Sequence, residues 1–78
     1  MKSRAVIREI MKEQNVTNAM LAHRINMSIA ATWDLVSKDS NQYDMRANRL
    51  VPVLTALDYK LVAVPKDAEV PTGGYVID

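Results

Sequence analysis

Apolar residues recur every three or four positions through the first fifteen residues of the chain. Those that fall on one face of a helix are Val6, Ile7, Ile10 and Met11. Charged side chains occupy the opposite face, a pattern typical of an amphipathic helix. Ser3 is an N-cap residue by type, and Asn15 tolerates the left-handed conformation in which many helices end. The pattern predicts a first helix over about residues 3–14.

Two shorter helical segments follow, over about residues 17–25 and 28–37. Thr17 and Ser28 are N-cap residues by type, and Asn26 ends the apolar pattern of the earlier segment. Because only two or three residues connect the segments, the two helices cannot be collinear and must cross at a steep angle.

A polar stretch, 38–44, predicts a loop before a fourth helical segment. We expect Asp44 to cap this helix, which would continue through Leu57. Pro52 lies inside the pattern, where it either kinks the helix or occupies the first turn of a new one. The sequence leaves both arrangements open.

From Asp58 the pattern changes to that of β-structure. Residues 59–64 are rich in β-branched and aromatic types and end at Pro65, and residues 75–78 form a second short apolar stretch. A two-stranded hairpin is marginal in water, so we expect these strands to pack on the helices or to pair with another copy of the chain. The prediction is an all-α fold of four to five helices over residues 1–58, with a C-terminal β extension for dimerisation over residues 59–78.

Composition narrows the function classes. A chain of 78 residues buries only about 60% of its unfolded surface, so contacts with a partner are expected. The 49% of hydrophobic residues argues against a disordered tail.

Cysteine is absent and His23 is the one histidine, so we expect no disulfide, metal or cofactor. No leader or membrane span is expected, which favours the cytoplasm, and a net charge of +1 does not by itself indicate nucleic acid.

The segment 17–28, TNAMLAHRINMS, resembles the helix-turn-helix of the Cro/C1-type (XRE) family of phage repressors. The family pattern is Thr/Ser-Gln-x-x-Leu-Ala-x-x-hydrophobic-Gly-hydrophobic-Ser. Residues 50–59 resemble the family's last helix, so the resemblance covers about residues 3–59. Asn26 stands where the family usually has glycine. Met11 and Val36 stand where many members carry a buried Arg–Glu pair, and such a pair is often replaced by apolar residues without loss of stability.

The resemblance implies a dimeric, sequence-specific transcriptional regulator: a repressor or autoregulator of phage, mobile-element or antitoxin type. Its third helix would enter the major groove of double-stranded DNA. An antitoxin would also have a toxin partner, and the sequence does not choose between these roles. Expected contacts with the DNA backbone are Thr17, Asn18, Ser28, Lys38, Ser40, Asn41, Gln42, Tyr43 and Arg46. Expected contacts with base edges are Asn18, Ile29, Ala30 and Asp34, and expected dimer contacts are Tyr59, Leu61, Val62 and Val64.

The third helical segment is poor in hydrogen-bonding side chains. Apolar side chains can contact a thymine methyl group, whereas Asp34 can only accept, from cytosine, and repels phosphate. We expect Thr32 to face the core, Trp33 to be buried, and His23 and Arg24 to be solvated. The alternative function is a protein-interaction module that keeps this fold without specific DNA reading. No catalytic triad, phosphate loop or metal-ligand spacing is present in the sequence, so we do not expect an enzyme.

Overall fold

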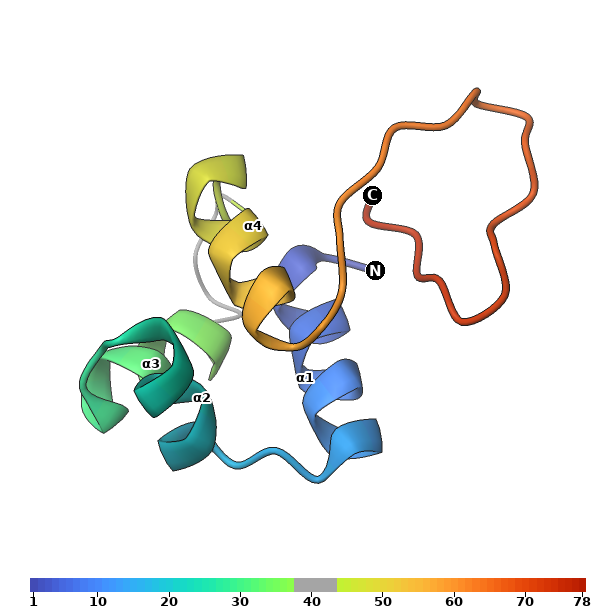
Figure 1. The fold of residues 1–78 in the computed structure, drawn as a ribbon. Coiled ribbons are helices and arrows are strands. Elements are labelled where there is room, and N and C mark those ends of the chain that lie inside the picture. Colours follow the sequence, from blue (N-terminus) through green and yellow to red (C-terminus); the bar gives the residue numbers. More distant parts are fainter. Residues whose placement is uncertain (38–43) are drawn as a thin grey trace.

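The computed structural model describes residues 1–37 and 44–78. Its regular elements in these ranges are α1 (Ser3–Gln14), α2 (Asn18–Ile25), α3 (Ile29–Ser37) and α4 (Ala47–Ala56). The helices form one body, and the chain after α4 leaves it as a wide loop whose end returns to the N-terminus (Figure 1). The all-α prediction is confirmed for the described ranges. None of these helices has the length and apolar character that crossing a membrane requires.

Helices α1, α2 and α4 end in the same way. Asn15, Asn26 and Asp58 have φ values of 55°, 57° and 64°, in the left-handed region. In each case the next backbone N–H donates to the carbonyl five residues earlier: Val16 to Met11, Met27 to Ala22 and Tyr59 to Leu54. Asn and Asp tolerate this conformation better than most residues. The prediction that Asn15 and Asn26 end helices is confirmed.

The connection between α2 and α3 is held at both helix starts by side-chain caps. Thr17 Oγ1 accepts from the Met20 amide at 3.2 Å. Ser28 Oγ accepts from the Ala31 amide at 3.1 Å. Both predicted N-caps are confirmed, and together with the left-handed Asn26 they separate residues 18–37 into two helices.

The other two predicted N-caps are wrong. Ser3 is the first residue of α1 and only 1% exposed. Asp44 precedes α4, whose N-cap residue is Arg46. The Asp44 carboxylate instead accepts from the Ser3 amide at 3.2 Å and from Ser3 Oγ at 3.0 Å, so it caps α1. Both Ser3 and Asp44 are residue types that commonly cap helices. Their pairing joins positions far apart in the sequence, so no local sequence pattern predicts it.

The core lies where α1 and α4 meet, with α2 packed against α4 and α3 packed against α1 and α2. Its most deeply buried apolar side chains are Ile7, Ile10, Leu21 and Leu57. Met11 and Val36 belong to the same buried cluster. Thr32 is fully buried as predicted, and its hydroxyl has no hydrogen-bond partner in the described part of the chain.

Pro52 lies inside α4, so the segment from Ala47 to Ala56 is one helix that contains the proline. The side chain of Pro52 is exposed, whereas Val53 and Leu54 are buried. The proline therefore occupies the solvent side of α4, and the apolar face of the helix continues past it into the core.

The predicted β extension is wrong: residues 59–64 and 75–78 are irregular, and no strand occurs within residues 1–37 and 44–78. The backbone of the C-terminal end pairs with Met1 instead. Met1 N donates to the Val76 carbonyl, and the Asp78 amide donates to the Met1 carbonyl, both at 3.0 Å. An isolated hairpin of two short strands is only marginally stable in water. Here the two limbs of the segment, residues 59–64 and 75–78, are separated by a cavity.

Tyr59 and Tyr75 attach this C-terminal segment, residues 59–78, to α1. Their rings lie 6.2 Å apart, and the hydroxyl of Tyr59 is 3.5 Å from a carboxylate oxygen of Glu13. A hydrogen bond to Glu13, burial and the negative charge of Glu13 raise the pKa of Tyr75 to about 12. Tyr59 therefore packs within its own chain, although the sequence placed it among the dimer contacts.

Candidate functional site

One side of α3 is left uncovered by the residues that the structure describes, 1–37 and 44–78. Thr32 and Val36 are 0% and 2% exposed on the inner side, whereas Ile29 and Trp33 are 59% and 56% exposed. The residues that we call the outer face of α3 are Ile29, Ala30, Trp33 and Asp34, all of them exposed. Ile29 with Trp33, and Ala30 with Asp34, are four residues apart and so lie one turn apart on the same side.

The burial predicted for Trp33 is wrong. Thr32 and Val36 are the buried residues of α3, and their spacing of four fixes which side of the helix faces α1 and α2. Trp33 follows Thr32 directly and is therefore rotated out of the interface. A single large aromatic residue favours burial on average, but the phase of the helix decides its position.

The start of α2 and the start of α3 both reach the surface. Thr17 and Ser28 are exposed while their side chains cap the helices, and Asn18 is half-buried. Helix starts carry backbone N–H groups without intrahelical partners, and these groups favour anions such as phosphate. The predicted backbone-contact residues of this region are thus placed at two accessible helix ends.

Arg49 is a residue that the sequence analysis missed. Its Nη1 lies 3.9 Å from the Sδ atom of Met27, so a cation of α4 lies against the connection between α2 and α3. Arg46, which was predicted to contact DNA, is exposed at the start of α4. Arg46 is the N-cap residue of α4 and Arg49 lies three residues later, in the first turn, so a pair of arginines close together in the sequence was the available signal.

The exposed residues predicted on α2 are as expected. His23 and Arg24 are both exposed. Arg24 Nη1 donates to the Ala56 carbonyl at 3.2 Å, so this side chain joins α2 to the end of α4.

The DNA contacts predicted for the polar stretch before α4 lie outside the described residues. They are Lys38, Ser40, Asn41, Gln42 and Tyr43.

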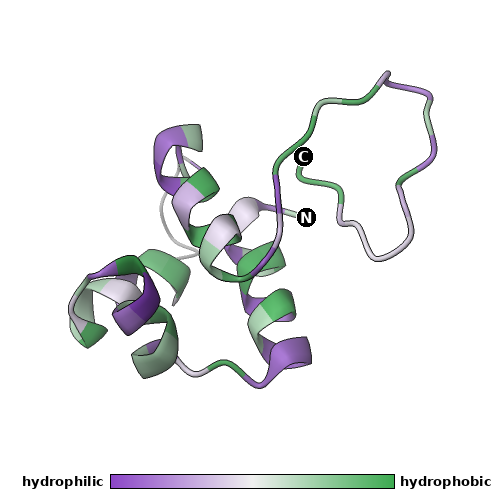
Figure 2. Ribbon diagram, in the orientation of Figure 1, coloured by the Kyte–Doolittle hydropathy of each residue, from purple (hydrophilic) through white to green (hydrophobic). Residues whose placement is uncertain are grey.

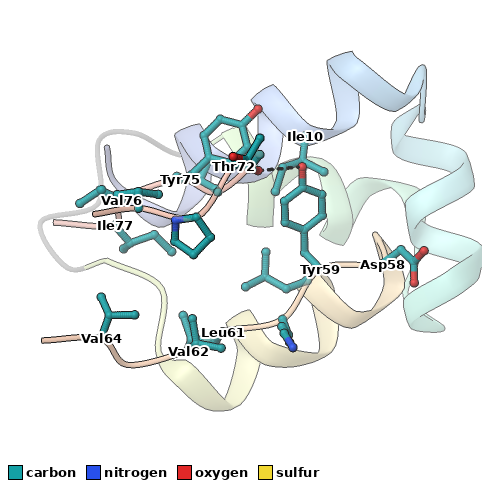
Figure 3. A pocket seen from close by; sticks show the side chains of 17 residues that line it. Ile10, Asp58, Tyr59, Leu61, Val62, Val64, Thr72, Tyr75, Val76 and Ile77 are labelled. Atoms are coloured by element: carbon teal, nitrogen blue, oxygen red, sulfur yellow. Dashed lines mark hydrogen bonds between the residues drawn. The ribbon is translucent and has the colours of Figure 1, made fainter. Parts of the chain in front are cut away.

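A second feature is a cavity of about 460 Å³ between the C-terminal segment and the helices. Val6, Ile10 and Leu54 line it from α1 and α4, and Leu61, Val62 and Val64 line it from the segment itself. Figure 3 shows these side chains and the hydrogen bond from the Tyr59 hydroxyl to the Gly73 carbonyl, at 3.4 Å. Leu61, Val62 and Val64 are 45%, 56% and 51% exposed, so the three apolar dimer residues predicted from sequence remain accessible.

Comparison with protein-family models, with curated proteins and with solved structures gives no match. Within residues 1–37 and 44–78, no three His, Cys, Asp or Glu side chains are grouped so that they could hold a metal ion. The candidate site is therefore the outer face of α3 together with the two helix starts, Arg46 and Arg49 around it.

Proposed function

We propose that this chain is a sequence-specific transcriptional regulator that binds double-stranded DNA through a Cro/C1-type helix-turn-helix formed by α2 and α3. The observation that carries the proposal is the position of α3. Its inner side packs against α1 and α2, while its first turn, with Ile29 59% exposed, is open to the solvent. An α-helix fits the major groove, which is about 12 Å wide, only if one side and one end are free in this way.

The residues around α3 have defined parts in such a complex. The outer face of α3 would meet the base edges, and α2 would lie across the backbone. Thr17, Asn18 and Ser28 would meet phosphates together with the free amides of the two helix starts. Arg46 and Arg49 would contact the phosphates beside the groove and fix the position of the protein on the duplex.

The test is a titration of fluorescently labelled duplex DNA with the protein at two salt concentrations. One duplex carries the region upstream of the protein's own gene, and a scrambled duplex of the same composition is the control. The proposal expects tighter binding to the upstream duplex and a fall in affinity as salt rises. Equal affinity for both duplexes, or no binding at low salt, contradicts it.

Replacing Arg46 and Arg49 together with alanine is expected to weaken binding to every duplex and to flatten its salt dependence. Each phosphate contact that is lost should reduce the slope of log K against log salt by about 0.9. The control is Lys66→Ala, which removes a cation from the C-terminal segment, on the side of the molecule away from α3 in Figure 1. An unchanged slope in the double variant would exclude these arginines from the interface.

We also propose that the regulator is a homodimer joined through its C-terminal segment. Much of both limbs of this segment is hydrophobic in Figure 2, and Val70 and Val76 are 44% and 53% exposed in addition to Leu61, Val62 and Val64. A backbone without a strand partner next to exposed valines favours pairing with another chain. The segment lies on the opposite side of the helices from α3 in Figure 1, so pairing there leaves the outer face of α3 free.

Introducing charge into this surface is expected to separate the dimer. Val62→Asp combined with Val64→Asp should give the monomer mass in light scattering, because a charged side chain cannot be buried without a partner. The matched control is Val51→Asp, since Val51 is 45% exposed on α4. A wild-type protein that is already monomeric, or a double variant of unchanged mass, would disprove this assembly.

The exposed apolar side chains of α3 favour a second candidate, a module that binds another protein. Ile29 and Trp33 together present an aliphatic and an aromatic surface, which protein partners commonly cover. A toxin recognised by an antitoxin would be one such partner. Absence of any duplex binding at low salt would leave this candidate in place of the regulator.

A further inference from the structure

We propose that the outer face of α3 selects its DNA site through the 5-methyl groups of thymine in the major groove. The inference depends on the proposed function, because it names what α3 contacts once a duplex is bound. It adds the chemical feature that distinguishes a cognate site from other sequences.

The hydrogen-bonding inventory of the outer face carries the argument. Guanine presents two acceptors in the major groove and adenine presents an acceptor with a donor, so purines are read mainly by side chains that donate. Ile29 and Ala30 have no polar side-chain atom, and an ionised Asp34 only accepts. The indole N–H of Trp33 is the one side-chain donor among these four residues. The apolar feature that remains in the groove is the thymine methyl group.

The positions of the apolar side chains agree with this reading. Ile29 and Ala30 belong to the first turn of α3, the end of a recognition helix that contacts base edges. Trp33 lies one turn further along the same side as Ile29, about 6 Å along the helix axis. A site with two nearby thymines would therefore bring methyl groups to both side chains.

The charges around the outer face favour a nucleic acid over a protein as its partner. Arg49 lies against the turn before α3, and Arg46, the N-cap residue of α4, is exposed three residues earlier in the chain. An apolar helix face with a cation beside the turn that precedes it complements a groove in which methyl groups lie between two rows of phosphates. Asp34 is the single acidic residue of the outer face, and its carboxylate can accept from the amino group of a neighbouring cytosine.

The test uses the full chain and a duplex selected from a random library. Each thymine is replaced in turn by deoxyuridine, which keeps the base pair and removes only the methyl group. Affinity should fall about four-fold for each methyl group that the protein buries. Ile29→Ala and Trp33→Ala should each reduce the difference between thymine and deoxyuridine, while Val51→Ala, on α4, should preserve it.

The outcomes separate this inference from the function on which it depends. Selective duplex binding that is unaffected by deoxyuridine at every position overturns the methyl contact and leaves the regulator standing. No duplex binding at low salt overturns both and indicates a protein partner for the outer face. The deoxyuridine series uses the wild-type protein, so its result does not depend on whether the alanine variants fold.

Discussion

Replacement of Leu21 by alanine is expected to lower the free energy of unfolding by about 3 kcal/mol. Leu21 is fully buried and belongs to the core cluster, to which α1 and α4 also contribute. The alanine removes apolar contacts and leaves a space that the small core fills only in part. A domain of this size has a free energy of unfolding of about 5–15 kcal/mol, so this one change would remove a large share of it.

The effect should be greatest on α2 and on the connection to α3. α2 has 8 residues, and an isolated helix of this length is unstable in water, so its packing supplies most of its stability. Urea unfolding followed by far-ultraviolet circular dichroism measures the change, since the exposed Trp33 is a poor reporter of the core. The matched control is Met20→Ala: Met20 is adjacent on α2 and 42% exposed, and its truncation should cost no more than about 0.5 kcal/mol. Equal midpoints for the two variants would show that Leu21 does not hold α2.

The helices were predictable because their signals are local. Thr17 and Ser28 cap the residues that directly follow them, and Asn15 and Asn26 end the helices that directly precede them. Such patterns lie within a few residues of the helix ends that they define. The inward position of Thr32 followed from the same helical spacing.

The predictions that were wrong concern contacts between segments that are far apart in the sequence. The pairing of Asp44 with Ser3 joins the start of α1 to the chain before α4. No sequence pattern near either residue indicates this pairing. Residues 59–64 have the composition of a strand, but a strand also needs a partner, and the C-terminal end pairs with Met1 instead.

The candidate site was predictable in outline only. The sequence identified Ile29, Ala30 and Asp34 as exposed on the third helix, and the structure places them there. The exposure of Trp33 depends on which side of α3 meets α1 and α2, and the approach of Arg49 to Met27 depends on how α4 lies beside the turn. Both are consequences of packing, so single-sequence patterns could not supply them.

The carboxylate of Asp44 is expected to stabilise the fold by about 2 kcal/mol near neutral pH. This value lies within the range found for hydrogen bonds to a charged group. It accepts from the amide and hydroxyl of Ser3 and from the Met45 amide at 2.8 Å. Asp44→Ala would remove these contacts and leave the buried amide and hydroxyl of Ser3 without their acceptor. The matched control is Asp67→Ala, which removes an exposed carboxylate from the C-terminal segment.

The same contacts make the contribution of Asp44 depend on pH. Burial raises the pKa of its carboxyl group, but hydrogen bonds from Met45 and Ser3, with the nearby charge of Lys2, outweigh burial and hold the pKa below its ordinary value of 3.8. A pKa that is lower in the folded than in the unfolded state stabilises the fold above the unfolded value, and the gain is lost as the pH falls through the folded value. The difference in unfolding free energy between wild type and Asp44→Ala should therefore be constant from about pH 7 to pH 5 and should shrink below the unfolded pKa. Urea titrations at a series of pH values measure that difference directly, and subtraction of the variant removes the similar acid response of Asp78, whose pKa is also lowered. A difference that stays constant down to the lowest pH at which the protein folds would mean that the charge of Asp44 contributes nothing to the cap.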